Sequence, residues 1–136
     1  MEDLFLKIVA GEIPCSRVYE DAQFFAFLDI KPINKGHTLV IPKRKYRNIF
    51  DMDADTFASL GKAAHHVALA VKKATGADGI NITMNNEAAA GQDVFHAHMH
   101  VIPRFTDDYV FTPPHHTTYD EGEKDVVAEK IRQSLA

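Results

Sequence analysis

The chain has 136 residues, of which 46% are hydrophobic and 25% are charged, a composition that suits one folded domain and argues against disorder. Its formal net charge of −4 at pH 7 argues against binding to a nucleic-acid backbone, which needs a basic face, but leaves room for a small anionic ligand. The single cysteine, Cys15, excludes an internal disulfide and suits a reducing compartment.

The start of the chain, Met1-Glu2-Asp3, is acidic and has no apolar run, so we expect no signal peptide. No apolar stretch elsewhere reaches the roughly 20 residues that a membrane-spanning helix needs. We therefore expect a cytoplasmic protein whose partners include neither a membrane nor a nucleic acid.

Hydrophobic periodicity and turn residues predict an α+β domain: a short helix, three strands, a long helix, two further strands and a helical tail. In chain order we place these elements at 3–10, 17–20, 24–29, 37–42, 53–75, 80–85, 94–103 and about 123–136. Gly11 ends the first helix, and Asp53 and Gly76 bound the long one. Because the strand connections are short, the sheet should be mostly antiparallel, with the long helix over one face. The apolar stripe that packs on the sheet should consist of Phe57, Leu60, Ala64, Val67 and Val71.

The most informative segment lies in the last predicted strand, where His96, His98 and His100 alternate with apolar residues. Alternation is the period of a strand, so one face of this strand should carry all three imidazoles. We expect that face, which also carries His37 and Asn85, to lie opposite the long helix and to hold the functional site.

A row of histidines can have one of three roles: metal binding, ordinary structural packing, or chemistry on an anion. One metal ion cannot easily bind all three rings, because His96 and His100 are separated by four residues of strand, roughly 13 Å. Ordinary structural histidines explain one such residue better than three in strict alternation. Anion chemistry is the remaining use, because a neutral imidazole is a nucleophile, a protonated one is a donor, and a pKa of about 6.5 makes both forms accessible.

The segment His96-Ala97-His98-Met99-His100-Val101-Ile102 resembles the pattern that gives the histidine triad (HIT) family its name. The order and spacing of family motifs are also found in five further segments, at 5–14, 27–30, 36–43, 85–87 and 90–92. The chain looks most like the bacterial form of the Hint branch over about residues 3–105, and 106–136 is a divergent tail. The resemblance implies one domain over 1–136, a HIT-like fold of about five antiparallel strands, and a homodimer whose sheets join.

The resemblance also implies a role for each histidine. His98 would attack the α-phosphorus of a nucleotide and form a covalent nucleotidyl-histidine, from which water releases a nucleoside monophosphate. The backbone carbonyl of His96 would accept from the His98 ring, which leaves the other ring nitrogen free to attack. His100 would donate to the phosphate, and His37 would belong to the supporting hydrogen-bond network.

Other positions contact the nucleotide in family members. The resemblance implies the same contacts for the matching residues of this chain. Asn85 would contact the phosphate, and the segment Gly91-Gln92-Asp93 would present backbone N–H groups to its oxygens. Asp29 would accept from ribose hydroxyls. An apolar slot for the base would consist of Phe5, Ile8, Phe27, Ile30 and Leu39. From the residues alone, Asn85 also suits a turn, Asp29 suits an ordinary strand end, and the apolar residues suit a core.

One departure from the family pattern concerns metal binding. Several family members hold a structural zinc ion with two N-terminal cysteines, a histidine after a Pro-Lys pair and the first triad histidine. The first three positions here hold Asp3, Leu6 and Lys45. Since three ligands are missing together, we predict neither a structural zinc ion nor any other metal or cofactor.

Two further departures bear on specificity. Asp93 stands where many Hint-like proteins have Ser or Thr, whose hydroxyl can donate toward the leaving group, whereas an ionised carboxylate cannot donate. The tail contains His115-His116, which suits a solvent-exposed segment and whose role, like that of Asp93, the sequence leaves open.

The leading function is a nucleotide hydrolase or nucleotidyl transferase, similar to the purine nucleoside phosphoramidases, that acts on AMP- or GMP-type derivatives. A dinucleoside polyphosphate hydrolase is the alternative enzyme. A nucleotide-binding scaffold with vestigial activity is the alternative from another class. The sequence decides neither the physiological substrate nor its leaving group or base.

Overall fold

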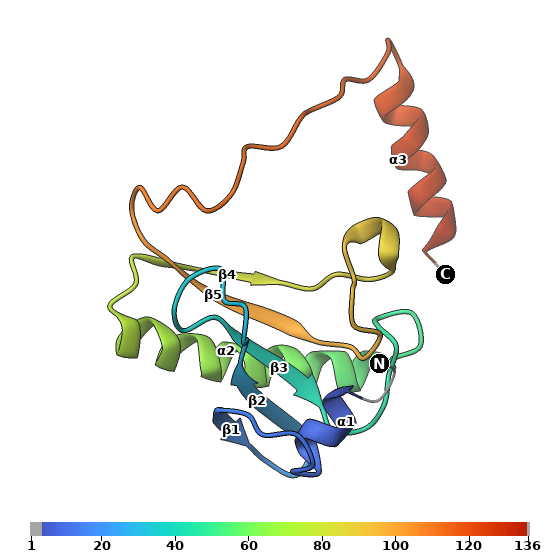
Figure 1. Ribbon diagram of the computed structural model, residues 1–136. Coiled ribbons are helices and arrows are strands. Elements are labelled where there is room, and N and C mark those ends of the chain that lie inside the picture. The colour runs from blue at the N-terminus through green and yellow to red at the C-terminus, as the bar shows by residue number, and fades with distance from the viewer. Residues whose placement is uncertain (1–3, 136) are drawn as a thin grey trace.

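The computed structural model describes residues 4–135, and at its centre is one sheet with a long helix along one face (Figure 1). The sheet has five strands: β1 (Arg17–Glu20), β2 (Phe24–Leu28), β3 (Thr38–Pro42), β4 (Gly79–Thr83) and β5 (Met99–Arg104). The helices are α1 (Leu4–Val9), α2 (Ala54–Thr75) and α3 (Glu123–Ser134), with one 3₁₀ turn, η1 (Ala88–Ala90), between β4 and β5. The α+β class and the predicted order of elements are confirmed. Within the described residues, no helix is long and apolar enough to cross a membrane.

The strands lie in the order β1-β2-β3-β5-β4, and every neighbouring pair is antiparallel, as predicted. Strand β5 lies between β3 and β4, so His100 has Leu39 on one side and Thr83 on the other. Strands β1 and β4 form the two edges. The topology therefore places the last triad histidine in the interior of the sheet.

Alternate strand residues point into two separate apolar clusters, one on each face of the sheet. Helix α2 packs on one face, where its buried residues meet Val40, Met99 and Val101. Helix α1 packs on the other face, where Phe5 and Ile8 meet side chains of β2 and β3. The central strands are consequently held from both sides.

Helix α2 begins and ends where the sequence predicts. The Asp53 carboxylate accepts from the backbone N–H of Thr56 at 3.0 Å, and Gly76 ends the helix in the left-handed conformation, with φ 71°. The prediction is wrong at Phe57, which is 42% exposed, because the helix meets the sheet only from Leu60 onward.

Two predicted strand ends near the site are wrong. Strand β2 ends at Leu28 and β4 ends at Thr83, so Asp29 and Asn85 lie in loops. Strand β3 begins one residue after His37. The backbone N–H of Asp29 donates to the carbonyl of His37 at 2.9 Å, which brings these two residues together at the end of the β2–β3 hairpin.

The predicted start of the histidine strand at residue 94 is also wrong, because β5 begins at Met99. The preceding segment leaves the ladder, since the N–H of Ala97 donates to the carbonyl of Tyr46, beyond the end of β3, at 2.7 Å. His96 and His98 therefore precede the strand, and only His100 lies within it.

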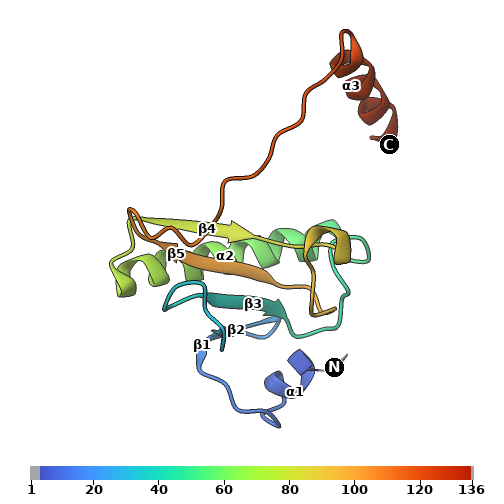
Figure 2. The same ribbon diagram turned by 45° about the horizontal axis from the view of Figure 1, so that its top comes forward.

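The tail leads away from the domain. Residues 106–122 contain no helix or strand and run past β4 to α3, which buries none of its residues (Figure 1 and Figure 2). The helix lies within the predicted 123–136. The predicted first residue of the N-terminal helix, Asp3, and the last residue, Ala136, lie outside the described residues.

Candidate active site

The ring of His98 is fixed by its own backbone. Its Nδ1 lies 2.7 Å from the carbonyl oxygen of His96, and because a carbonyl oxygen can only accept, Nδ1 carries the proton. The other ring nitrogen, Nε2, then has a free lone pair. The residue is 4% exposed, and the ring of Phe5 stands edge-on to it with centroids 5.2 Å apart. The predicted bond to the His96 carbonyl is present, and it leaves the imidazole in the form that a nucleophile requires.

A second chain of hydrogen bonds fixes the tautomers of His37 and His100. The backbone N–H of Ile33 donates to Nδ1 of His37 at 3.1 Å, so the proton of neutral His37 is on Nε2. That Nε2 lies 2.9 Å from Nδ1 of His100 and donates to it. The proton of neutral His100 is then on its own Nε2, from which it can be donated to a ligand. His37 thus sets the donor atom of His100.

His96 contributes its carbonyl, while its side chain braces the segment against β3. The ring Nε2 donates to the carbonyl of Pro42 at 2.7 Å, and the ring is edge-on to Phe5. Its Nδ1 is buried without a hydrogen-bond partner among the described residues. The residue is 1% exposed, so its ring does not face a ligand.

Burial keeps the four imidazoles neutral near pH 7. It lowers the pKa of His96 and the pKa of His100 to about 4 in each case. Burial also lowers the pKa of His98, against the opposing effect of the carbonyl bond and nearby carboxylates, and it lowers the pKa of His37. His98 is therefore in its nucleophilic form at neutral pH.

A pocket of about 380 Å³ opens beside the triad, on the face of the sheet that carries α1. Most of the predicted site residues line it together: Phe5, Ile8, Phe27, Asp29, Ile30, Leu39, Asp93, His98 and His100. All five residues of the predicted base slot are included, with Ile30, 89% exposed, at the rim. The pocket thus combines an apolar wall with the unprotonated Nε2 of His98 and the protonated Nε2 of His100.

Asp29 lies in this pocket just after β2. One carboxylate oxygen accepts from the backbone N–H of Lys31 at 2.9 Å, and the other lies 3.7 Å from Nε2 of His37. Since a carboxylate oxygen can accept more than one hydrogen bond, Asp29 keeps acceptor capacity for hydroxyl groups of a ligand.

Three predicted phosphate contacts, Asn85, Gly91 and Gln92, do not line the pocket. The N–H of Gly91 donates to the carbonyl of Ala88, and the N–H of Gln92 donates to that of Glu87, at 3.0 and 3.1 Å. The amide of Asn85 lies against the same loop, with Nδ2 3.4 Å from the carbonyl of Gly91. In this structure the N–H groups of Gly91 and Gln92 therefore donate within the loop, and the phosphate contacts of Asn85, Gly91 and Gln92 stay predictions.

The side chain of Gln92 belongs to a buried network that the sequence did not reveal. Its Oε1 accepts from Nδ2 of Asn48 and from the N–H of Glu87, at 3.0 and 2.8 Å. Its Nε2 donates to the carbonyls of Arg47 and Val94 at 2.7 and 3.1 Å. Arg47 and Asn48 also donate to the Glu87 carboxylate. These bonds join the loop before the triad to the loop after β3, across separations that no local sequence motif spans.

Asp29, His37 and His100 each offer a ligand atom, and the three atoms lie within 4.8 Å of one another. The hydrogen bonds argue against a metal ion there. Nε2 of His37 carries a proton, and Nδ1 of His100 accepts it, so neither lone pair is free for a metal. We assign this cluster to hydrogen bonding.

The positions of the family's structural zinc site do not suit zinc either. Leu6 offers no ligand atom, Lys45 carries an ammonium group, and Asp3 lies outside the described residues. Among the described positions only the imidazole of His96 offers zinc a ligand, and zinc in a structural site takes four ligands.

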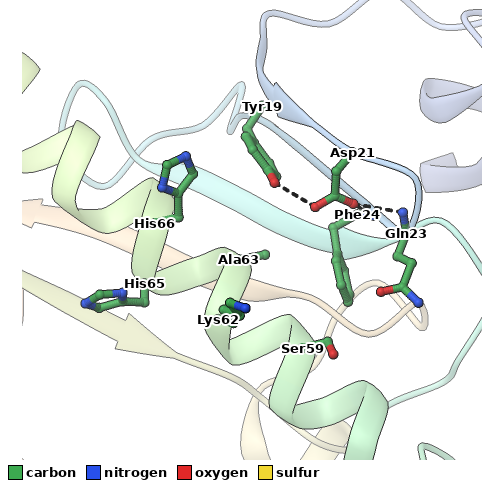
Figure 3. A pocket seen from close by; sticks show the side chains of 9 residues that line it. All are labelled: Tyr19, Asp21, Gln23, Phe24, Ser59, Lys62, Ala63, His65 and His66. Atoms are coloured by element: carbon green, nitrogen blue, oxygen red, sulfur yellow. Dashed lines mark hydrogen bonds between the residues drawn. The ribbon is translucent and has the colours of Figure 1, made fainter.

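A second hollow, of about 530 Å³, lies on the other face, between α2 and the β1–β2 hairpin (Figure 3). Its carboxylate, Asp21, is already engaged, because it accepts from the hydroxyl of Tyr19 at 2.6 Å and from the N–H groups of Gln23 and Phe24. The ring of His66 stands edge-on to Tyr19. These contacts explain the hollow as a tight turn packed on a helix, and none of its residues was predicted to act in a site.

Comparison with known proteins gives independent findings. The model of the HIT domain matches residues 10–107. The chain is 44% identical over 102 residues to the protein Hit of Bacillus subtilis, which is 75% of this chain and 70% of that protein. It is 42% identical over 101 residues to the adenylylsulfatase HINT3 of Arabidopsis thaliana, which is 74% of this chain and 51% of that protein.

The crystal structure of a Streptococcus mutans protein superposes on this chain with a TM-score of 0.92 at 47% identity, covering 100% of this chain and 87% of that one.

Proposed function

The chain belongs to the HIT family of nucleotide-binding hydrolases and transferases, and we propose that it is a Hint-like enzyme that removes the substituent from the α-phosphorus of purine nucleoside monophosphate derivatives. The observation that carries this proposal is the free Nε2 of His98 in a pocket that also has an apolar wall and a carboxylate. These are a nucleophile, a place for the base and an acceptor for ribose hydroxyls.

In the first step, the lone pair on Nε2 of His98 attacks the α-phosphorus and forms a nitrogen–phosphorus bond. The bond from phosphorus to the substituent breaks, and the substituent leaves with the electron pair and takes up a proton from water. The hydrogen bond from Nδ1 to the His96 carbonyl stabilises the positive charge on the ring. In the second step, water attacks the same phosphorus and loses a proton to solvent, so that the nucleoside monophosphate leaves and His98 is restored.

The surrounding groups bind and orient the substrate. His100, whose Nε2–H is set by His37, donates to a phosphate oxygen and stabilises the charge that develops there. Phe5 and Phe27, with ring centroids 5.5 Å apart, form the wall against which a purine packs. Asp29 accepts from the ribose hydroxyls.

Asp93 favours a substituent that is joined to phosphorus through nitrogen. Asp93 lines the pocket together with His98 and His100, and its negative charge acts on both imidazoles. A phosphoramidate nitrogen carries an N–H that can donate to this carboxylate. A bridging oxygen of a polyphosphate can only accept, and the chain beyond it brings more negative charge. We therefore place phosphoramidates ahead of dinucleoside polyphosphates as substrates.

Mass spectrometry after mixing with a slowly cleaved adenosine phosphoramidate tests the mechanism. We expect a nucleotidyl adduct on His98 in the unchanged protein and no turnover by His98→Ala. That variant should still bind AMP within about tenfold of the unchanged protein, because the ring attacks the substrate rather than anchoring it. Equal turnover by the variant would contradict the nucleophile. AMP binding without any adduct or turnover in the unchanged protein would favour a scaffold.

We also propose a homodimer joined through β4. An edge strand has unpaired backbone groups along one side, and Ile82 of β4 is 47% exposed. Antiparallel pairing of β4 with its copy around a two-fold axis would join the two sheets into one.

A further inference from the structure

One charged residue of the pocket has no part in the chemistry proposed above. Lys31 lines the pocket, and it is the only lysine or arginine among the described residues that do so. The residue is exposed, and within residues 4–135 its ammonium group forms no ion pair or hydrogen bond. This cation is therefore available to a ligand.

The contacts of Asp29 indicate which end of the pocket Lys31 occupies. One carboxylate oxygen of Asp29 accepts from the backbone N–H of Lys31 at 2.9 Å, and the other lies 3.7 Å from Nε2 of His37, the ring bonded to His100. The carboxylate thus lies between the imidazoles and Lys31. A nucleotide with its phosphate at His98 and its ribose at Asp29 would have its base at the end where Lys31 lies.

The rest of this end of the pocket is apolar. Phe5 and Phe27 form the wall, and Ile30, at the rim, directly precedes Lys31. Apolar side chains pack against the faces of a purine but give no partner to the nitrogen and oxygen atoms along its edge. The exposed Cys15 also lines the pocket, but its thiol is only a weak donor. Lys31 is therefore the strong donor at the end where the base would lie.

An ammonium group distinguishes the two common purines by the atoms at one edge. Lysine has three N–H donors and no acceptor. Guanine has two acceptors side by side on this edge, O6 and N7, whereas adenine has the acceptor N7 beside a donor, the amino group at position 6. A lysine can therefore donate to both atoms of a 6-oxopurine, and it meets a second donor in adenine.

We propose that Lys31 selects the base, so that the enzyme prefers derivatives of the 6-oxopurine nucleotides GMP and IMP to derivatives of AMP. The ammonium group donates to O6 and N7 at the rim while the apolar wall packs against the faces of the ring. Lys31 determines specificity and takes no part in bond breaking, because the base is remote from the α-phosphorus. This inference rests on the proposed function, which places the phosphate at His98, and it adds the base to the substrate class.

Binding of three nucleoside monophosphates, the type of product that the reaction releases, tests this selection. IMP has the O6 of GMP but lacks its 2-amino group, so it isolates the contact at position 6. We expect GMP and IMP to bind the unchanged protein about fivefold more tightly than AMP, because a hydrogen bond from a charged donor is strong but solvent weakens it at an exposed side chain. Isothermal titration calorimetry measures the three dissociation constants.

Three variants assign the preference to Lys31. Lys31→Met removes the donors and keeps a long side chain, so IMP and AMP should then bind within about twofold of each other. Lys31→Arg keeps donors and should keep the preference. Lys35→Met, the matched control, removes the same charge from an exposed residue that does not line the pocket, and it should also keep the preference. Competitive turnover of guanosine and adenosine phosphoramidates should show the same changes in the ratio of kcat/KM values.

The outcomes separate this inference from the proposed function. AMP that binds the unchanged protein as tightly as IMP would overturn the selection by Lys31. A preference that persists in Lys31→Met would do the same, and so would an equal loss for all three nucleotides, which would mean that the cation attracts the phosphate. In each case a nucleotidyl adduct on His98 would leave the proposed function standing. A protein that binds none of the three nucleotides would overturn both.

Discussion

At the scale of residues, the site is built on ring tautomers that backbone groups fix. His98 donates to a carbonyl two residues earlier, and His37 accepts from the N–H of a residue four positions earlier. A backbone carbonyl can only accept a hydrogen bond and a backbone N–H can only donate one, whereas a titrating side chain can change from donor to acceptor. The free lone pair of His98 and the donor of His100 are therefore present before a substrate binds, and no energy is needed to reorganise them.

Replacing Asp93 with asparagine should change which leaving group is preferred. Asp93→Asn removes a negative charge and adds an N–H donor, so the penalty for a bridging oxygen falls and the acceptor for a phosphoramidate N–H weakens. We expect the ratio of kcat/KM for an adenosine phosphoramidate to that for a diadenosine polyphosphate to fall about tenfold. Competitive turnover of the two substrates measures this ratio.

Asp107→Asn is the control for that substitution, because it removes the same charge outside the pocket. It should leave the ratio unchanged. If Asp93→Asn also leaves the ratio unchanged, the carboxylate does not select the leaving group.

Site residues could be predicted from the sequence where they lie in one short segment or where they are apolar residues of a family pattern. Alternation indicates that His98 and His100 share a face, and the apolar residues that line the pocket, such as Phe27 and Leu39, could be carried over from a family pattern. The buried network of the Gln92 side chain could not be predicted, because its hydrogen bonds depend on the loop after β3.

At the scale of elements, one loop determines how the triad segment meets the sheet. The segment between β4 and β5 contains η1 and Glu87, whose positive φ of 79° is uncommon for a residue other than glycine. Arg47 and Asn48 donate to the Glu87 carboxylate, and they lower its pKa to about 2. Side-chain hydrogen bonds thus hold this loop in place of a strand ladder. The ladder of β5 begins only at Met99.

Replacing Gln92 with leucine should weaken this loop more than replacing Arg47 with methionine. Gln92→Leu leaves a buried amide of Asn48 and two carbonyls short of a partner, which costs about 1–3 kcal/mol in the free energy of unfolding. The Arg47–Glu87 pair is about half exposed on both sides, so its loss should cost less than about 1 kcal/mol. Urea denaturation of both variants gives the comparison, and an equal or larger loss for Arg47→Met would contradict this account.

Element ends could be predicted where the signal is a cap and not where it is a tertiary contact. Asp53 and Gly76 bound α2 because each acts on the adjacent turn of the helix. The start of β5 depends on the carbonyl of Tyr46, some fifty residues away, and alternation alone could not show that the ladder stops before His98.

At the scale of the whole molecule, the two faces of the sheet and its β4 edge have different surroundings. One face packs on α2 and forms the larger core, the other carries α1 and the pocket beside His98, and β4 is the edge strand at which we propose the homodimer. The buried histidines belong to both the pocket and the packing. Protonation of these histidines should therefore lower the free energy of unfolding as well as change the chemistry of the pocket.

The free energy of unfolding should fall as the pH is lowered from 6.5 toward 4. The folded-state pKa of His96 and that of His100 are about 4, against an ordinary value of 6.5. Below pH 6.5 the unfolded chain binds protons at these positions and the folded chain does not, so protonation favours unfolding until the pH reaches about 4. We expect a loss of about 3 kcal/mol for His96, the more completely buried ring, at about 1.4 kcal/mol per pKa unit.

Urea titrations in steps from pH 7.5 to 4.5 measure this loss in a window that the carboxylates do not share. Carboxylates with a lowered pKa, such as Glu87, lose their contribution only as the pH falls below their ordinary value of 4.5. His96→Gln keeps a donor for the carbonyl of Pro42 but does not titrate, so it should remove about half of the decrease, whereas His65→Gln, at an exposed position, should leave the decrease intact. A free energy of unfolding that stays constant between pH 7 and 5 in the unchanged protein would show that His96 and His100 are not held neutral by burial.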